Sequence, residues 1–180
     1  MIQDLKKFII PENFRGRSIL IVQLWWFVDF FFFKLSPQIT YGWRRLLLRL
    51  FGAKIGKGVI VRPSVTVTYP WKLSIGDYSW IGDDVVLYSL GEIEIGANVV
   101  ISQKSYLCTG SHDYKSVEFP IYSAKIKIED ECWLATDVYV APGITIGRGT
   151  VVGARSSVFK DLPQGKVCVG SPATPIKDRT

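Results

Sequence analysis

The chain has 180 residues, a mass of 20.3 kDa and a net charge of +6, so it is long enough for one domain with a real hydrophobic core. The basic excess is uneven, because residues 1–52 hold eight Lys and Arg against three Asp and Glu, a net +5, and the remainder is almost neutral. Because nucleic-acid binding needs cations along the body of a domain, no nucleic-acid partner is expected. Three cysteines without metal-ligand spacing predict reduced thiols and a cytoplasmic location.

Residues 1–52 are predicted to form a helical, largely apolar segment. Ser18 is expected to cap a helix that runs to about Lys34, and a second helix covers 41–51 and stops at Gly52. No small-residue cleavage site follows the apolar run, so no secretory signal is expected.

The apolar run of the first helix has two interpretations. It is shorter than the roughly 20 residues that span a bilayer, and it contains Asp29, so a spanning helix is not expected. Either the run covers the open end of the fold or packs between subunits. Or residues 18–51 lie peripherally in the membrane interface, with Trp25, Trp26 and the flanking arginines as anchors.

An aliphatic residue recurs every six positions through most of the chain. This spacing matches neither the 3.6-residue period of a helix nor the two-residue period of a strand. It is typical of a parallel β-helix, in which each repeat supplies one short strand and one turn. The column consists of Ile55, Val61, Val67, Leu73, Ile75, Ile81, Leu87, Ile93, Ile95, Ile101, Leu107, Ile128, Leu134, Val140, Ile146, Val152 and Val158.

Two further columns keep the same register. Four residues after most of the aliphatic positions stands a small or β-branched residue, and the position directly after the aliphatic residue is often glycine, as at Gly56, Gly76 and Gly96. One large and one small inward residue suit a narrow three-sided core, and glycine suits its tight corners. We therefore predict an all-β fold, a single-stranded parallel β-helix over residues 53–163, with N-terminal helices and a protruding loop.

The six-residue register is interrupted once, at residues 108–125. A loop ejected from a solenoid usually lies on the functional face of the protein. Beyond the repeats, residues 164–180 are predicted to form a C-terminal tail with a strand around 166–169 and an extended end.

His112 is the only histidine, and it lies in the interrupting loop beside Asp113. Its imidazole is well suited to accept a proton from a hydroxyl at physiological pH, although a lone histidine is often structural. Asp113 either orients the ring or is solvated, and Cys108 is interpreted as a packed thiol instead of a nucleophile. A single histidine excludes the three-histidine zinc site of β-helical carbonic anhydrases, so no metal is expected.

Several stretches resemble the hexapeptide-repeat acyltransferases, specifically the maltose, galactoside and nodulation O-acetyltransferase group. They are TGSHDY at 109–114, KIKIEDECWLATDVYVAPGITIGRGTVVGARSSVFKDLP at 125–163 and VGSPATPIK at 169–177. FRGRSILIVQLWW at 14–26 and RRLLLRLFGAKIGKGVIVRP at 44–63 resemble the colanic-acid biosynthesis acetyltransferases. Together these stretches cover nearly the whole chain.

The resemblance implies a left-handed β-helix that assembles as a homotrimer, with active sites between neighbouring subunits. It also implies direct transfer of an acetyl group from acetyl-CoA to a sugar hydroxyl, in surface or exopolysaccharide biosynthesis. His112 would then be the general base, and a backbone N–H near Ala135 or Thr136 would stabilise the oxyanion. The residues that the resemblance places at the acceptor are Tyr88, Ser89 and Asp113.

The same resemblance assigns C-terminal residues to acetyl-CoA. Trp133 packs near the pantetheine arm, and Ala154 permits a close approach of the cofactor to the backbone. Basic side chains meet the phosphates. The full cofactor set is Trp133, Ala135, Thr136, Ala154, Arg155, Lys160 and Lys177.

Two other functions remain open on the sequence. One is an acetyltransferase that modifies antibiotics or serine, against which the N-terminal segment argues weakly. The other is a β-helical assembly or binding module without catalysis, against which the lone loop histidine argues.

Overall fold

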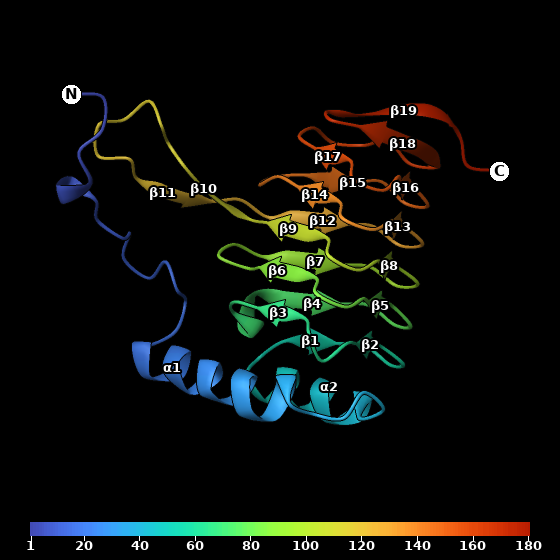
Figure 1. Cartoon of the computed structure of the whole chain (residues 1–180), viewed down its shortest axis with the longest axis horizontal. Coiled ribbons are helices and arrows are strands. Elements are labelled where there is room, and N and C mark those ends of the chain that lie inside the picture. Colours follow the sequence, from blue (N-terminus) through green and yellow to red (C-terminus); the bar gives the residue numbers. More distant parts are fainter.

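The computed structural model describes residues 1–180 and consists of a parallel β-helix that stands on two helices (Figure 1). Each coil places one short strand on each of three faces, and strands on one face pair in parallel, one coil apart. The first face contains β1 (Lys54–Ile55), β4 (Leu73–Ile75), β7 (Ile93–Ile95), β12 (Ile126–Ile128) and β15 (Thr145–Ile146).

The other two faces follow the same order along the chain. The second face contains β2 (Ile60–Val61), β5 (Trp80–Ile81), β8 (Val100–Ile101), β13 (Trp133–Leu134), β16 (Val151–Val152), β18 (Lys166–Gly170) and β19 (Ala173–Asp178). The third face contains β3 (Thr66–Val67), β6 (Val86–Tyr88), β9 (Tyr106–Cys108), β14 (Tyr139–Val140) and β17 (Ser157–Val158). The predicted β-helix is therefore confirmed.

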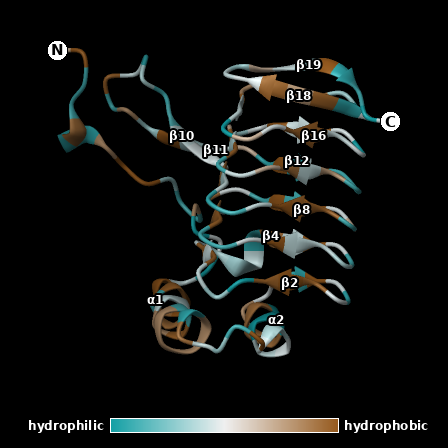
Figure 2. Cartoon of the chain, turned by 45° about the vertical axis from the view of Figure 1, so that its right-hand side comes forward, coloured by the Kyte–Doolittle hydropathy of each residue, from teal (hydrophilic) through white to brown (hydrophobic).

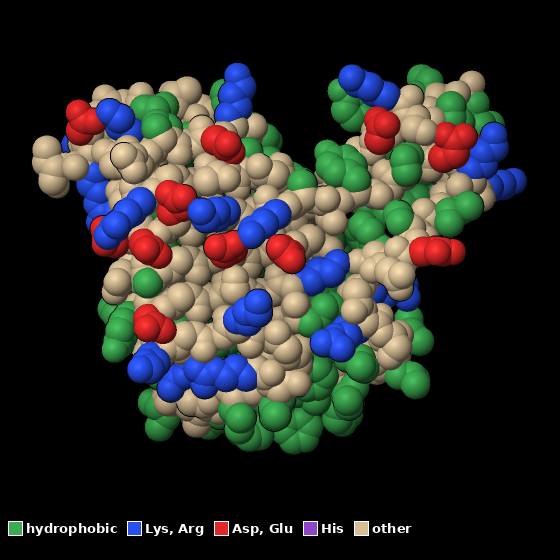
Figure 3. All heavy atoms as spheres, turned by 180° about the vertical axis from the view of Figure 1, so that it is seen from behind, with side chains coloured by type: hydrophobic (Ala, Val, Ile, Leu, Met, Phe, Trp, Pro, Cys, Tyr) green, Lys and Arg blue, Asp and Glu red, His purple; other side chains and the backbone are tan.

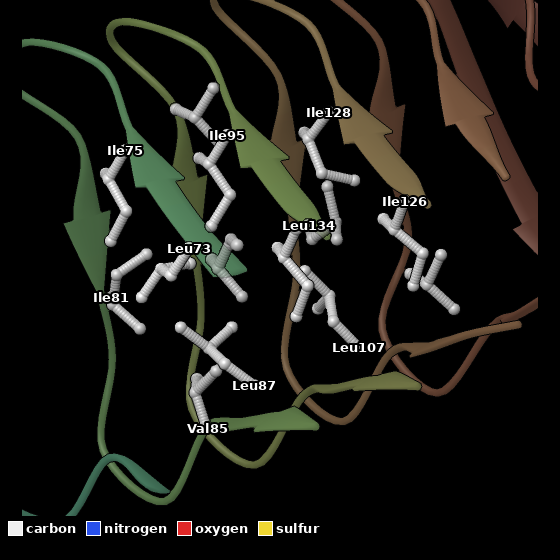
Figure 4. Close-up of a cluster of buried hydrophobic side chains, with 14 of the residues drawn as sticks. Leu73, Ile75, Ile81, Val85, Leu87, Ile95, Leu107, Ile126, Ile128 and Leu134 are labelled. Carbon is white, nitrogen blue, oxygen red and sulfur yellow. The ribbon is translucent and has the colours of Figure 1, made fainter. Parts of the chain in front are cut away.

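The aliphatic column of the sequence forms the core of the coil. Every residue of that column is buried, none more than 8% exposed, and the register stacks equivalent side chains directly above one another. The inward side chains interdigitate along the axis of the coil (Figure 4). The small residues of the second column are buried as well, and the hydroxyls of Ser79, Ser105 and Thr150 donate to backbone carbonyls, as Ser79 Oγ does to Gly96 O at 2.7 Å.

Gly76 shows why the corners need glycine. A Cβ atom at this position would lie 2.6 Å from the backbone nitrogen of Ala97 in the next coil, and backbone cannot move aside cheaply. We expect Gly76→Ala to lower the free energy of unfolding by about 1–3 kcal/mol. Chemical denaturation measures the loss, with Gly42→Ala as the control, because that helical position has no neighbour closer than 3.8 Å.

The base of the coil is covered by α2 (Tyr41–Leu50), whose three arginines each bond to backbone carbonyls of the coil. Arg44 is fully buried and donates from Nε to Val61 O at 2.7 Å. Arg45 donates to Val59 O at 2.8 Å, and Arg49 donates to Ile55 O at 2.6 Å. These bonds satisfy carbonyls at the open end of the solenoid, so α2 covers this end, a role considered from the sequence for the apolar run of the first helix. The expectation that these arginines anchor the chain in a membrane is wrong, because their guanidinium groups bond to the coil.

The first helix differs from the sequence expectation in its second half. The α-helix α1 spans Ile19–Val28 and continues as a π-helix, η2, over Asp29–Lys34. Ser18 makes no side-chain cap. Trp25 and Phe33 point into the fold and are fully buried, and the indole of Trp25 donates to Val67 O at 2.8 Å. None of the helices is both long and apolar enough to cross a lipid bilayer.

Two segments leave the body of the coil. The interrupting loop forms an antiparallel hairpin of β10 (Gly110–His112) and β11 (Ile121–Ser123), and the N-terminal segment with the short helix η1 (Leu5–Lys7) runs beside it (Figure 1). Asp4 N donates to Val117 O at 2.8 Å, which ties the two together. The tail forms the strand expected around residues 166–169, but the predicted extended end is a further strand, β19, which pairs antiparallel with β18. The second 3-10 helix, η3, is Pro70–Lys72.

Candidate active site

The hairpin holds His112 at its outer half. β10 and β11 pair with Gly110 opposite Ser123 and His112 opposite Ile121. The root of the hairpin is fixed by Thr109, which is fully buried and donates from its hydroxyl to Tyr88 O at 2.6 Å. The imidazole is therefore presented from a braced element that stands away from the coil.

The imidazole of His112 lies between two phenylalanines. Its ring stacks on Phe119 with centroids 4.3 Å apart and 10° between the planes. Phe8 of the N-terminal segment approaches with its centroid at 5.8 Å, tilted by 49°. Phe119 itself adopts a positive φ of 50°, a strained conformation for a large side chain that is common at functional sites. The N-terminal segment thus contributes one of the two aromatic rings beside the imidazole of His112.

The ring nitrogens of His112 have different surroundings. Nδ1 lies 2.9 Å from the carbonyl oxygen of Phe119. A carbonyl only accepts hydrogen bonds, so Nδ1 carries the proton and Nε2 of the neutral ring keeps its lone pair. The side chain is half-buried, and no other hydrogen bond engages it. This arrangement leaves Nε2 free to accept a proton.

Asp113 does not orient the imidazole. Its Oδ1 accepts from the backbone N–H of Lys115 at 3.0 Å and so closes a turn at the tip of the hairpin. The orienting group is the backbone carbonyl of Phe119, which sequence reasoning missed. No pattern in the sequence marks this carbonyl, because only the pairing of β10 with β11 brings it to His112.

The two other residues expected at the acceptor lie at the root of the hairpin with different exposure. Tyr88 is half-buried at the end of β6 and packs, as the hairpin residue Ile121 does, against the buried cluster of Val22, Tyr69 and Leu90. Ser89 is fully buried, and its hydroxyl accepts from Tyr69 N at 2.8 Å. This bonding gives Ser89 a structural role, so we retain Tyr88 alone as an acceptor contact.

A second group of expected site residues lies at the corner between the second and third faces. Trp133 stands on β13 with its ring 46% exposed, and its indole donates to Ser102 Oγ at 3.1 Å. Thr136 follows in the same coil, and the next coil places Ala154 and Arg155 above it, where Arg155 N donates to Thr136 O at 2.9 Å. The structure therefore stacks Thr136 and Arg155 in adjacent coils, with Trp133 and Ala154 within three residues of them along the chain.

The two backbone N–H groups considered for an oxyanion differ. The N–H of Ala135 donates to Val152 O at 2.9 Å, within the pairing of adjacent coils. The N–H of Thr136 has no acceptor in the chain, while its hydroxyl donates to Gln103 O at 3.0 Å. Only Thr136 therefore has a donor available for a ligand.

The remaining cofactor residues are spread over other places. Lys160 follows β17 and lies where the chain leaves the third face, at the edge that also carries the hairpin. Lys177 is exposed on β19 opposite Val167, at the C-terminal end of the second face. Neither lysine joins Ala154 and Arg155 within one chain.

Between the two edges, the third face carries a ladder of aromatic side chains that sequence reasoning missed. Tyr88, Tyr106, Tyr139 and Phe159 follow one another with centroids 6.0, 6.2 and 5.8 Å apart. A hollow of about 460 Å³ beside them is lined by Lys104, Tyr106, Cys108, Asp137, Val138 and Tyr139. Burial, with the nearby Cys108, raises the pKa of Tyr139 to about 12, so its phenol stays neutral. Tyr106 and Tyr139 are 33 residues apart in the sequence, so the regular spacing of the repeats does not reveal the ladder.

His112 and the corner with Thr136 lie at opposite edges of the third face. The hairpin leaves after β9 toward the first face, whereas Thr136 precedes β14 on the side of the second face. A strand with its corners spans roughly 15 Å, at about 3.3 Å per residue. The hairpin arm points outward, and a notch separates it from the upper coils (Figure 3). One chain therefore does not bring the imidazole to its own corner residues.

The comparisons with known proteins agree with this architecture. Residues 125–160 match the family described as bacterial transferase hexapeptide (six repeats). The crystal structure of a maltose O-acetyltransferase from Clostridium difficile 630 is similar over 91% of this chain and 90% of that one, with a TM-score of 0.83 and 27% identity. A hexapeptide-repeat acetyltransferase of Vibrio cholerae, solved with acetyl coenzyme A, shares the fold at a TM-score of 0.81 over 92% of both chains and 24% identity.

Two curated relatives extend the comparison to sequence. The galactoside O-acetyltransferase of Escherichia coli K12 is 30% identical over 75% of this chain and 68% of its own. The protein named "Putative colanic acid biosynthesis acetyltransferase WcaF" in the same organism is 64% identical over 98% of this chain and 97% of its own. With such identity over almost its full length, and with the repeats and coil described above, the chain belongs to the hexapeptide-repeat acetyltransferase family.

Proposed function

We propose that this acetyltransferase moves the acetyl group of acetyl-CoA to a sugar hydroxyl in the assembly of a surface or exopolysaccharide, with His112 as the general base. The names of the relatives support the reaction class and the polysaccharide setting. The three cysteines are free thiols, which is consistent with a cytoplasmic reaction.

One observation carries the assignment of the base. The bond from Nδ1 of His112 to the Phe119 carbonyl fixes the tautomer whose Nε2 accepts a proton. In the proposed step, Nε2 takes the proton of the acceptor hydroxyl while the hydroxyl oxygen attacks the thioester carbonyl. The C–S bond then breaks, the acetyl ester forms, and the imidazolium returns its proton to the leaving thiolate.

The corner residues provide the other half of the site in this proposal. The N–H of Thr136 donates to the oxyanion of the tetrahedral intermediate. Trp133 offers an exposed ring to the pantetheine arm, and Ala154 presents backbone without a bulky side chain. Arg155, Lys160 and Lys177 are the cations for the phosphates.

We propose that the working unit is a homotrimer. The reacting groups must come within about 3–3.5 Å of one another, yet His112 and Thr136 of one chain lie at opposite edges of a face. A neighbouring copy that places its corner against the hairpin completes the site without distortion of either chain. Lys160 then also faces a cofactor held between two copies.

The proposal is tested by release of the CoA thiol from acetyl-CoA against a panel of mono- and oligosaccharides, with mass spectrometry of the products. Serine and hydroxyl-bearing antibiotics belong in the panel as competitors for the acceptor role. A gain of one acetyl group on a saccharide supports the proposal. Turnover with serine or an antibiotic alone, or with no acceptor of any class, contradicts it.

A further prediction concerns Phe8, which we regard as a positioning residue. The ring of Phe8 packs on the imidazole of His112 with centroids 5.8 Å apart, so removal of Phe8 allows the imidazole to leave the productive orientation. An aromatic pair contributes about 0.5–1.5 kcal/mol, so Phe8→Ala should lower kcat about threefold to tenfold and leave KM for acetyl-CoA unchanged. Steady-state kinetics measure both constants.

Two variants control the Phe8 experiment. Phe8→Tyr keeps the ring and should restore kcat. Leu5→Ala alters a side chain of the same segment that is 63% exposed and should not affect kcat. A fall in kcat of equal size in Leu5→Ala would show that Phe8 acts only through the general order of the segment.

A further inference from the structure

The outward side of α1 and η2 is a large apolar surface without a partner in the chain. Only one stripe of this helical segment, which includes Val22, Trp25 and Phe33, is buried. Most of the other side chains are also apolar, with Gln23 as the exposed polar exception in α1, and the ribbon of α1 is mainly hydrophobic (Figure 2). We call the following exposed residues the base surface: Leu20, Leu24, Trp26, Phe27, Phe30, Phe31, Phe32, Leu35, Trp43, Leu46 and Leu50.

The phenylalanines of the base surface contact one another. Phe27 packs on Phe31 with centroids 4.8 Å apart and on Phe32 at 6.1 Å, and Phe30 contacts Phe31 at 4.9 Å. The space-filling view shows hydrophobic side chains massed across the lower end of the molecule, with Lys and Arg side chains above them (Figure 3). Exposed apolar patches of this kind mark interaction sites.

The charge around the base surface is mainly positive. Residues 13–76 contain ten Lys and Arg and a single acid, Asp29. Arg44, Arg45 and Arg49 bond to the coil and Arg62 pairs with Asp83 at 3.0 Å, so the cations available to a partner are others, such as the exposed Lys54 and Lys57. The Asp29 carboxylate is 9% exposed and pairs with Lys34 at 3.1 Å, so it offers no negative charge to a partner. A second copy of the same surface would bring cations against cations, whereas an anionic partner fits.

We propose that the base surface docks on the anionic surface of a lipid bilayer, with its aromatic side chains in the interface and the surrounding cations at the headgroups. The mixture of Trp, Phe and Leu with a basic surround is the composition of interfacial segments, and each Lys or Arg near an anionic leaflet adds about 1 kcal/mol. Contact without a spanning helix is consistent with the helix lengths.

The geometry of the solenoid strengthens the contact. α1 lies across the end of the coil, so the base surface is roughly perpendicular to the coil axis (Figure 1). In the homotrimer proposed above, on which this step rests, three parallel coils present three base surfaces to the same plane. Multivalent contact then gives avidity beyond that of one copy. The hairpins stand away from the bilayer, at the distance of several coils.

Sedimentation of the full chain with vesicles tests this inference. One set of vesicles contains phosphatidylcholine alone and the other phosphatidylcholine with phosphatidylglycerol. We expect the protein to pellet with the anionic vesicles and to be released as the salt concentration rises. Equal sedimentation with and without the anionic vesicles would overturn the inference.

Substitutions test separately whether the aromatic rings and the cations contribute to membrane binding. Phe30→Ser combined with Phe31→Ser removes two rings that are 57% and 50% exposed, and should lower the partition coefficient at least about tenfold. Lys54→Glu with Lys57→Glu should lower binding to anionic vesicles only. The matched control, Ile176→Ser, alters a 59% exposed residue at the opposite end of the coil and should bind as the wild type does.

Two further measurements separate the outcomes. If light scattering without lipid shows that the wild type is larger than the phenylalanine variant by a whole multiple, a second copy covers the base surface and the inference fails. His112→Ala should bind vesicles as the wild type does, so loss of acetyl transfer and loss of membrane contact are distinguished.

Discussion

Replacement of His112 by alanine is expected to reduce the rate of acetyl transfer about 10²–10⁴-fold, the usual contribution of a general base. The hairpin should keep its shape, because β10 and β11 pair through their backbones and Thr109 anchors their root. The loss should therefore appear in kcat, with little change in KM for acetyl-CoA. The thiol-release assay, run with an accepted saccharide, measures both.

A second substitution at this position separates proton transfer from ring placement. His112→Asn can still donate a hydrogen bond to the Phe119 carbonyl, but it has no basic nitrogen, so it should be as inactive as the alanine variant. Lys115→Ala, at the tip of the same hairpin, should retain full activity. Turnover by His112→Asn near the wild-type level would refute the assignment of His112 as the base.

The architecture was predictable because it depends on local periodicity. The β-helix requires that each short strand bury one aliphatic side chain and that a tight corner follow it. An aliphatic residue at every sixth position, often with glycine next to it, meets both requirements. Ile55, Ile75 and Ile95 are in register on one face as that spacing requires. The insertion between Leu107 and Ile126 was equally visible, since it breaks the count. Patterns of this kind can be recognised from residues that are close together in the sequence.

The surroundings of the candidate base were not predictable in the same way. His112 was identifiable as a unique residue type in the loop, but its partners come from pairing at a distance. Phe119 reaches the ring only through the antiparallel register of the hairpin, and Phe8 arrives from the other end of the chain. The division of the site between two edges of the third face was also not predictable from the sequence. Thr136 and Lys160 lie on different edges because each follows a strand of a different face.

The arginines of α2 illustrate how composition misleads. Three arginines among leucines suggest a basic amphipathic helix for a membrane surface, yet the guanidinium groups turn to the open carbonyls of the coil. The carbonyls need these side-chain donors because the first strands, β1 and β2, have no coil below them to pair with. The apolar character of α1 was visible in the sequence, but its division into a buried stripe and an outward surface depends on how it meets the coil.

The largest loss of stability is expected at Arg44. Its side chain is fully buried and donates five hydrogen bonds, three of them to the carbonyls of Val61, Pro37 and Gln38 at 2.7, 2.9 and 2.6 Å. Burial lowers the pKa of the guanidinium group, but arginine stays charged, so the bonds are charge-assisted. Arg44→Met keeps the volume but removes the donor from the carbonyl of the buried Val61 and the bond to Gln38 O, whereas Pro37 O keeps its bonds from Thr40. We expect it to lower the free energy of unfolding by about 3 kcal/mol or more.

The location of the damage distinguishes this account from a general loss of packing. Coils in a solenoid contact mainly their neighbours, so removal of the end cover should open β1–β3 first and leave the coils around β14 protected. Hydrogen exchange measures this gradient. Arg44→Lys should be intermediate, and Arg45→Met, which removes one bond from a half-buried residue, should cost much less. A uniform rise in exchange along all coils of Arg44→Met would contradict the covering role, because it would mean that Arg44 stabilises the chain as a whole instead of closing the end where the strands have no partner.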